Sequence, residues 1–387
     1  MVDLSKVVVE DPTLDEFFAV VARSHQQSPR SHLGGSRIGA PCSRQLFYEF
    51  HWVAPSTFKP KTYLNFDDGH YSEDKVAGIL KQIPGVDLYT RDEKERQISY
   101  SDFGGHFGIS VDGMILGILQ APLTWHIWEH KCVSEKRFRD FKRKKEKVGE
   151  KQTLEEWDET YFGQAQVYMG LSKKKRHYLT VATAGTRDLT SCRTEYQPAK
   201  FKALMEKSRE IIFSEKPPPP ISDKADYYIC RWCNFNEHCH GSKIASVNCR
   251  TCAHVTAKDD GTWRCEFHDK QLSYTAQTRG CSKHLFNPSL VPFADPVRMD
   301  KENNTITYVT PGGKAFTNAE TNDWSDWAKG TPSLTSKDLQ HLDESLISSE
   351  AAFFEAAAVF SPTITSVKKK KKPTHLPELN DDLPNGL

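Results

Sequence analysis

The sequence predicts an α/β core, followed by a small cysteine-rich module and a polar C-terminal tail. Amphipathic, helix-like segments alternate with apolar, strand-like runs between residues 11 and 214. Four consecutive prolines, Pro217 to Pro220, then close this part of the chain, because proline continues neither a helix nor a central strand. The stretch 230–281 contains seven of the ten cysteines, in short spacings that are typical of metal sites.

The elements of the core are expected in the order helices, three strands, helix, strand, helix. The first helix begins at an acidic cap, a Gly/Ser-rich turn follows it, and the closing helix ends before the prolines. The segments are helices at 11–26, 41–52 and 66–83, strand-like runs at 106–119 and 125–133, a basic helix or loop at 135–147, a helix at 152–171, a strand at 176–184 with a partner at 189–196, and a helix at 197–214.

We expect four regions along the chain. They are an N-terminal helical segment at 1–34, the core domain at 35–245, a cysteine-rich, zinc-type module at 246–290 and a variable C-terminal region at 291–387. Beyond about residue 330 the chain becomes polar and loses its periodicity. A short apolar run from Ala351 to Phe360 predicts a small helix, and the segment from Lys368 to the end predicts disorder.

The charge balance excludes a polycation, since the net charge is only +1. Any nucleic-acid surface must therefore be a local patch. No stretch is apolar enough to span a membrane, and the N-terminus lacks the apolar core of a signal peptide. These features favour the cytoplasm, where thiols stay reduced and disulfides are the weaker interpretation of the cysteines. No phosphate-cradling GxxxxGK[ST] loop is present, so no helicase motor is expected.

Two carboxylates and a lysine form the central motif. Glu129 and Lys131 are two residues apart in an apolar strand, so their side chains point to one face. Asp112 ends or bends the preceding strand, with Gly113 allowing a tight turn. Carboxylates on adjacent strands can hold Mg²⁺, or Mn²⁺ in its place, and the lysine can orient or deprotonate a water. This is the chemistry of phosphodiester hydrolysis.

An E-x-K pair alone is common, and its alternative interpretation is a solvated ion pair on an edge strand. Neighbouring residues strengthen the metal-site interpretation. His70 and Glu73 are three residues apart on one helical face, and either can add a ligand. Gln164 and Tyr168 lie one turn apart on a later helix, where they can position a phosphate or the lysine. By themselves these two residues would be interpreted as helix packing.

Taken in order, these motifs resemble those of the RecB-like branch of the PD-(D/E)XK nucleases, over roughly residues 35–245. The family pattern is G-x3-(H/E), D, E-x-K and Q-x3-Y, and Gly69 to Glu73 match its first part. The resemblance implies a restriction-endonuclease-like core, a mixed central sheet flanked by helices, and a backbone ligand at the carbonyl of His130. Members often have histidine where this chain has Glu73, so His70 stays a candidate. The resemblance implies catalytic roles for Asp112, Glu129, Lys131, Gln164 and Tyr168.

A split set of four cysteines predicts an iron–sulfur cluster. Cys230, Cys233 and Cys239 have the spacing C-x2-C-x5-C, which is one thiolate short of a complete ligand set, and Cys42 far upstream is the candidate for the fourth. This arrangement resembles that of CRISPR-adaptation nucleases and of the AddB nuclease domain, and implies a [4Fe–4S] cluster that joins the two ends of the domain. The alternative is a local zinc site completed by His238 or His240.

A second cysteine cluster predicts a structural zinc module. It lies in a segment that is too poor in apolar residues for a core of its own. His268 or His284 is a candidate replacement ligand, and a second iron–sulfur cluster is the alternative. The expected zinc ligands are Cys249, Cys252, Cys265 and Cys281.

Basic residues flank the predicted active site. A charge run is usually a solvated face, but Phe138 and Phe141 interleave with these cations, and phosphate contacts with aromatic stacking suit a single strand. The expected nucleic-acid contacts are Lys136, Arg137, Arg139, Lys142, Arg143, Lys173 and Lys174.

Together these motifs predict a Mg²⁺- or Mn²⁺-dependent DNA nuclease, with exonuclease action expected, in recombination, repair or replication. The architecture resembles bacteriophage exonucleases, which would work in the host cytoplasm beside a separate helicase or annealing protein. Two alternatives stay open: a catalytically inactive, metal-stapled module that binds nucleic acid, and a nuclease that acts on RNA.

Overall fold

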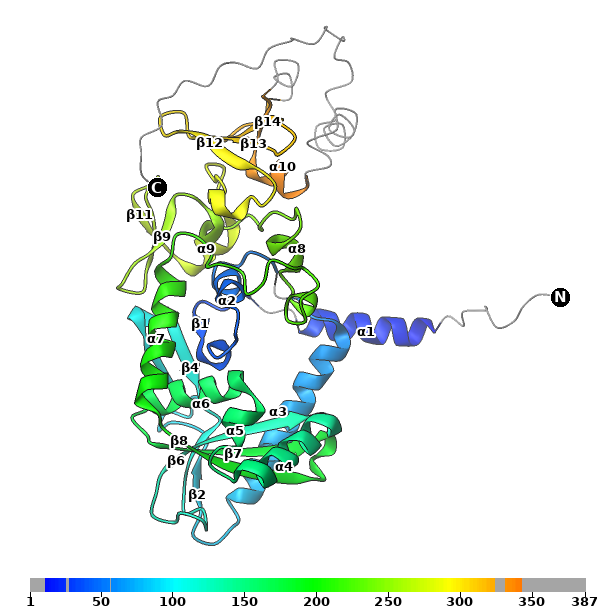
Figure 1. Cartoon of the computed structure of the whole chain (residues 1–387), viewed down its shortest axis with the longest axis vertical. Helices are drawn as coiled ribbons and strands as arrows, with labels where there is room; N and C mark the ends of the chain where they lie inside the picture. The colour runs from blue at the N-terminus through cyan, green and yellow to red at the C-terminus, as the bar shows by residue number, and fades with distance from the viewer. Residues whose placement is uncertain (1–10, 26–27, 56, 324–330, 343–387) are drawn as a thin grey trace, which may run out of the picture. The chain divides into compact units, whose positions relative to one another are not determined.

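The computed structural model describes residues 11–25, 28–55, 57–323 and 331–342. It has a mixed α/β architecture (Figure 1). The chain divides into two compact units. The first unit comprises residues up to Asp223 together with Thr256–Arg264 and Lys270–Leu272, and the second comprises the remaining described residues. The α/β prediction is confirmed.

The first unit is organised by a five-stranded mixed sheet in the order β2-β5-β6-β7-β8. Its central pair, β6 and β7, is parallel, and the other neighbours are antiparallel. A parallel pair needs a long crossover, which the helices α4, α5 and α6 supply between β6 and β7. The strands are β2 (Asp87–Tyr89), β5 (Gly113–Leu116), β6 (His126–Val133), β7 (Arg176–Thr183) and β8 (Leu189–Glu195).

Helix α3 (Pro60–Leu80) covers one face of this sheet. Its Val76, Ala77 and Leu80 pack with Ile115 and Trp128 in one buried cluster. Trp128 and Ile115 are fully buried there. This packing fixes the helix that carries His70 and Glu73 against the strand that carries Glu129.

The other helices of the first unit are α1 (Pro12–Ser24), α2 (Ser43–Phe50), α4 (Glu135–Val148), α5 (Thr153–Trp157), α6 (Glu159–Leu171) and α7 (Pro198–Phe213). Helix α6 contacts both β6 and β7, and α7 packs on α6. The expected single helix at 152–171 is interrupted at Asp158, whose extended backbone and side chain cap the start of α6. The interruption turns α6 so that Gln164 reaches the sheet.

Helix α6 approaches the turn η2 (Gly35–Arg37) and its continuation at very short range. A Cβ atom built on Gly39 would lie 2.6 Å from the carbonyl oxygens of Glu159 and Thr160, and one on Gly163 would lie 2.6 Å from the Cα of Gly39. Only glycine fits a backbone approach of this kind. The Gly/Ser-rich turn therefore sets the position of α6.

Smaller sheets complete the description. In the first unit β1 (Leu33–Gly34), β4 (Phe107–Ser110) and β3 (Ser99–Asp102) form a sheet in the order β1-β4-β3. The strands β9 (Val255–Ala257), β10 (Trp263–Cys265) and β11 (Lys270–Leu272) form another. Trp263 in β10 is buried, with its ring 5.3 Å from that of Phe50 and 5.7 Å from that of His106.

The second unit contains a four-stranded sheet that the sequence did not predict. Its order is β12-β13-β14-β15, with Tyr308, Phe316 and Leu334 fully buried. The strands are β12 (Asp295–Asp300), β13 (Thr305–Val309), β14 (Ala315–Asn318) and β15 (Ser333–Leu334). The unit also contains α8 (Asn236–Cys239), α9 (Tyr274–Arg279) and α10 (Ser336–Gln340). The predicted helix at 351–360 and the predicted disordered end lie outside the described residues.

Two further expectations need correction. The strand-like run at 106–119 is two strands, β4 and β5, separated at Val111 and Asp112. The rings of Phe138 and Phe141 are not available for base stacking, because both are buried beneath α4, with Phe141 5.0 Å from the ring of Trp157. The aromatic positions in the basic run are thus the core-facing side of an amphipathic helix. Among the described residues, no helix is both long and apolar enough to cross a membrane.

The Gly39 contact predicts a position-specific loss of stability. Gly39→Ala should lower the free energy of unfolding by about 1–3 kcal/mol, because backbone atoms must shift to admit the methyl group. Gly78→Ala in α3 is the matched control, since a Cβ there meets no atom within 4 Å. The control should be neutral or stabilising by up to about 1 kcal/mol. Urea unfolding of both variants measures the difference, and equal stabilities would contradict the tight approach.

Candidate active site

Four elements of the first unit bring the predicted catalytic residues together. Asp112 immediately precedes β5, Glu129 and Lys131 lie on β6, Glu73 lies on α3 and Gln164 on α6. Gly113 pairs with Trp128, so the ladder places Asp112 opposite Glu129. The alternation of side chains along β6 directs Glu129 and Lys131 to the face next to α6.

Glu129 is the most enclosed member of the cluster, with 3% of its surface exposed. Its Oε1 accepts hydrogen bonds from Lys131 Nζ at 2.5 Å and from Gln164 Nε2 at 2.6 Å. Its Oε2 is buried and has no hydrogen-bond partner among the described residues. A buried carboxylate oxygen without a donor is costly, which indicates that a positively charged group belongs beside it.

Asp112 is half-buried and anchored to β6. Its Oδ2 accepts the backbone N–H of His130 at 2.9 Å. This bond lies just beyond the β5–β6 pairs, which begin at Gly113 and Trp128. It holds the Asp112 carboxylate beside the strand that carries Glu129.

Burial and the proximity of the carboxylates raise the pKa values of Glu73 and Glu129. Burial, and then the Asp112 carboxylate, raise the pKa of Glu73 to about 7 and also raise the pKa of Glu129. Burial raises the pKa of Asp112 as well. Burial lowers the pKa of Lys131, but the negative charges of Glu129 and Asp112 raise it by more. The pKa of Lys131 is therefore raised overall. One lysine thus faces three carboxylates.

The donor set fits a divalent cation. The described residues contain no group of three His, Cys, Asp or Glu side chains already arranged around a metal position. Nevertheless, the cluster has excess negative charge when ionised, and no described residue donates a hydrogen bond to Glu129 Oε2. Oxygen ligands of this kind suit Mg²⁺ or Mn²⁺. His70 on α3 lies close enough to act on the Asp112 charge, so the structure leaves both α3 candidates near the site.

The side chain of His130 locks three elements together on the opposite face of the sheet. Its Nε2 lies 2.8 Å from Ser72 Oγ on α3, and its Nδ1 lies 3.0 Å from Thr180 Oγ1 on β7. Burial lowers the pKa of His130 to about 4, so the imidazole is neutral. The Thr180 hydroxyl donates to the carbonyl oxygen of Glu129 at 3.2 Å. His130 therefore positions Glu129 through the backbone and α3 through Ser72.

Tyr161 and Arg91 are neighbours of the site that the sequence did not identify. Lys131 Nζ lies 5.3 Å from the centre of the Tyr161 ring, and the Arg137 guanidinium lies 5.8 Å from it. Tyr161 is three residues before Gln164 on α6, so helical spacing would have indicated it. The positive charge of Arg91 is among those that act on Glu73.

Tyr168 is a buried neighbour of the site, with 3% of its surface exposed. Burial and the Glu129 carboxylate raise the pKa of this tyrosine, so its phenol stays protonated. It faces the cluster together with Gln164, one helical turn away. Gln164 forms a hydrogen bond with Glu129, whereas Tyr168 lies one turn farther along α6.

The basic residues that were predicted to contact nucleic acid differ in whether they form ion pairs. Arg137 forms an ion pair with Asp158 at 2.5 Å and lies over the ring of Trp157, and Arg143 pairs with Asp140 at 2.5 Å. Surface pairs of this kind are weak and leave the cations accessible. Of the seven predicted contacts, Lys136, Arg139, Lys142 and Lys173 are exposed and form no such pair with the described residues.

The second cysteine cluster lies in the second unit. Cys249, Cys252 and Cys265 are buried, and burial raises the pKa of Cys252 to about 12, with the thiols of Cys249 and Cys265 adding to the effect. These three thiols are therefore neighbours. Exposed Cys281 places its Sγ 3.7 Å from His268 Nε2.

The predicted iron–sulfur ligands are divided between the two units. Cys42 caps α2 in the first unit, whereas Cys230, Cys233 and Cys239 lie in the second. Cys42 and the other three cysteines thus belong to different units. The iron–sulfur cluster that they would share stays a prediction from the sequence.

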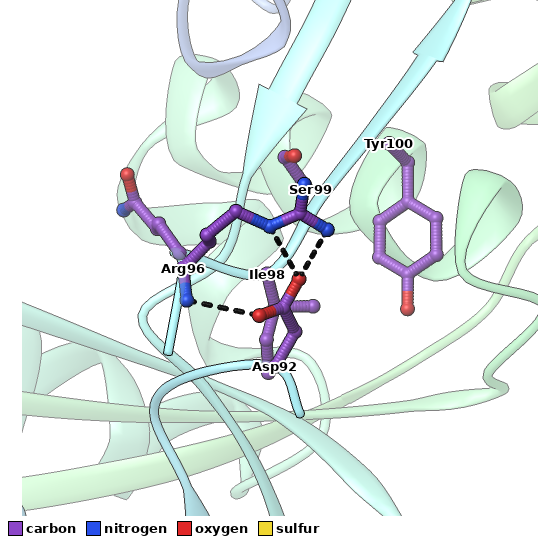
Figure 2. A pocket seen from close by; sticks show the side chains of 6 residues that line it. Asp92, Arg96, Ile98, Ser99 and Tyr100 are labelled. Atoms are coloured by element: carbon purple, nitrogen blue, oxygen red, sulfur yellow. Dashed lines mark hydrogen bonds and ion pairs between the residues drawn. The ribbon is translucent and has the colours of Figure 1, made fainter. Parts of the chain in front are cut away.

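A pocket of about 390 Å³ lies beside the turn that follows β2 (Figure 2). Asp92 accepts hydrogen bonds from the guanidinium and the backbone N–H of Arg96 (dashed in Figure 2), and their lengths are 2.8–3.1 Å. Arg91 bridges to Gln97 in the same turn. The pocket includes none of the predicted site residues, but its hydrogen bonds fix the backbone that carries Arg91.

Comparison with known proteins gives weak similarities only. No family model matches the chain, and no curated protein matches it significantly. An alkaline exonuclease from Laribacter hongkongensis, also solved in complex with dAMP, is 14% identical, with a TM-score of 0.34 over 51% of this chain and 90% of its own. A phage-related exonuclease from Haemophilus somnus is 13% identical, with a TM-score of 0.30 over 44% of this chain and 77% of its own. These scores are too low to assign a family.

Proposed function

We propose that this protein is a metal-dependent nuclease that hydrolyses phosphodiester bonds in DNA. The observation that carries the proposal is the enclosed cluster of Glu73, Asp112 and Glu129 beside Lys131, in which one Glu129 oxygen has no donor in the described part of the chain. A divalent cation held there would polarise a phosphoryl oxygen and stabilise developing charge. Asp112 and Glu129 would hold it, with Glu73 or His70 and the carbonyl of His130 completing the ligand set.

Lys131 serves as a hydrogen-bond donor in this proposal. Its raised pKa means that it keeps its proton at neutral pH. It can therefore orient a water or stabilise negative charge on the phosphate, rather than remove a proton. Gln164 holds Glu129 Oε1 on one side, and the ring of Tyr161 restricts the lysine on the other.

DNA is the proposed substrate because accessible cations lie next to the cluster. Helix α4 begins two residues after β6 and presents Lys136, Arg139 and Lys142 to solvent. Phosphate contacts from such residues give affinity without sequence preference.

We propose that the protein acts as an exonuclease in recombination, repair or replication. We further propose that it is encoded by a bacteriophage and works in the cytoplasm beside a separate helicase or annealing protein. RNA cleavage and an inactive binding module are the alternatives.

We also propose that the cysteines hold two structural metal centres. The neighbouring thiols of Cys249, Cys252 and Cys265, with Cys281 near His268, support a zinc site. The proposed [4Fe–4S] cluster, with ligands Cys42, Cys230, Cys233 and Cys239, rests on the cysteine spacing and on the family resemblance that it carries. Neither centre enters the chemistry of hydrolysis.

Conservative substitutions in the cluster test the proposed activity. Glu129→Gln and Asp112→Asn should abolish cleavage of end-labelled DNA in the presence of Mg²⁺, while DNA binding persists, because each removes a charged ligand but no phosphate contact. Lys131→Ala should slow cleavage by roughly a hundredfold or more. Glu135→Gln, an exposed change on α4, is the control and should keep full activity. Normal cleavage by the Glu129 variant would refute the proposal.

The raised pKa of Glu73 predicts a stability that depends on pH and metal. The folded protein keeps this proton up to about pH 7, whereas the unfolded chain loses it near the ordinary value. Without metal, stability should therefore fall as the pH rises from about 5 to about 8. Mg²⁺ should raise the melting temperature more at the upper end of this range, since it binds the ionised carboxylates. Glu73→Gln should flatten the profile, and an identical slope in this variant would contradict the assignment.

Metal analysis of cysteine variants tests the two centres. After purification without oxygen, Cys42→Ser should lose as much iron and visible absorbance as Cys233→Ser, because one cluster needs both thiolates. Cys249→Ser and Cys265→Ser should lose zinc but keep iron. Full iron content in the Cys42 variant would rule out the split cluster, and iron loss in the Cys249 variant would show a different division of the cysteines.

A further inference from the structure

Tyr89, an exposed aromatic residue, lies on the same face of the main sheet as Glu129, and the half-buried Trp125 lies beside it. Tyr89 on β2 pairs with Met114, and Met114 pairs with Ile127 on β6. Paired residues share a face of the sheet, and Ile127 shares its face with Glu129 two residues later. Tyr89 therefore lies on the face of Glu129. The ring of Trp125, just before β6, lies 5.9 Å from the Tyr89 ring.

The aromatic pair is accessible and accompanied by a cation. Tyr89 is 55% exposed and Trp125 is half-buried, in contrast to the fully buried Trp128 of β6. Lys174 Nζ lies 5.8 Å from the centre of the Trp125 ring. Burial in the core does not explain these two rings. Exposed aromatic faces beside cations are the combination on which nucleic-acid bases stack.

The register connects the pair to the acidic cluster. The β2–β5 ladder ends at the pair Tyr89–Met114. Arg91 lies two residues beyond Tyr89, and Asp112 lies two residues before Met114, so both residues extend from the same end of this ladder. Two residues of a strand span about 7 Å, which is the length of about two stacked nucleotides. Arg91 is exposed, acts on the charge of Glu73, and forms no ion pair with the described residues. The Tyr89 ring, the Arg91 cation and the carboxylates of the acidic cluster thus follow one another at this end of the sheet.

We propose that Tyr89 and Trp125 form a stacking site for an unpaired base of the DNA strand whose phosphate lies at the acidic cluster, with Arg91 contacting a phosphate between them. The cations on both sides, Arg91 and Lys174, favour a nucleic acid over an apolar protein segment as the occupant. This inference rests on the proposed nuclease function. It adds a requirement on the substrate: the DNA strand must be unpaired over about two nucleotides beside the acidic cluster.

Binding in a cleavage-deficient background tests the stacking site. In Glu129→Gln protein with Mg²⁺, a short fluorescent single-stranded oligonucleotide is titrated and its anisotropy measured. Adding Tyr89→Ala should weaken binding by about fivefold or more, whereas Tyr89→Phe, which keeps the ring, should bind normally. Tyr71→Ala removes an aromatic ring that is 75% exposed on α3, and this control should also bind normally. Unchanged binding by Tyr89→Ala would overturn the proposal.

An abasic nucleotide moved along the oligonucleotide locates the contact. At one position the missing base should weaken binding to the Glu129→Gln protein about as much as Tyr89→Ala does. At that position the two changes should not add, because they remove the same contact. Additive losses at every position would overturn the stacking site.

The same variants separate this inference from the nuclease proposal. Suppose that the otherwise unchanged protein does not cleave DNA, but that the losses of binding caused by Tyr89→Ala and by the abasic nucleotide are still non-additive. The nuclease proposal then fails, and the stacking site stands as a single-strand binding surface. If the protein cleaves DNA and Tyr89→Ala has the same KM and binding as the parent, the nuclease proposal stands and the stacking site is overturned.

Discussion

Three carboxylates enclosed beside a single lysine are the constraint on which the proposed site depends. Glu129 is nearly inaccessible to water, and its Oε2 has no donor among the described residues, while Asp112 and Glu73 raise the cost of ionising it. Lys131 compensates one charge only. Folding would avoid such an arrangement unless a function required it, since buried like charges disfavour one another. A divalent cation resolves the conflict, and phosphodiester hydrolysis is the chemistry that such a cation supports.

The rest of the first unit keeps these groups in place. The neutral imidazole of His130 joins α3 to β7 through Ser72 and Thr180, so the helix with Glu73 cannot move independently of the strand with Glu129. On the other face, the close approach of Gly39 to α6 sets the distance from which Gln164 reaches Glu129. Rigid elements on both faces thus support one cluster, as a preorganised site requires.

The sequence predicted this cluster because strand and helix periodicity decide which side chains share a face. Strand periodicity placed Glu129 and Lys131 on one face, whereas the approach of Gln164 to Glu129 was suggested only by the family resemblance. Arg91 could not be predicted, because its position depends on the register of an edge strand of three residues.

Other features depended on contacts that periodicity does not encode. Phe138 and Phe141 were interpreted as a binding surface, although helical spacing placed them in the core. The sheet at 295–334 was missed because its strands are short and irregular, with a bulge in β12. Spacing alone also cannot decide which metal the cysteines hold.

Direct measurement of Mn²⁺ binding tests the central claim most closely. Metal-free protein is titrated with Mn²⁺, and the free ion is followed by its electron paramagnetic resonance signal, with no DNA present. The account predicts that the protein binds Mn²⁺, that Mg²⁺ competes for the same site, and that Glu129→Gln weakens the affinity by about tenfold or more. Glu135→Gln should bind as the unchanged protein does. Equal Mn²⁺ affinity in the Glu129 variant would contradict the claim that the enclosed carboxylates form a metal site.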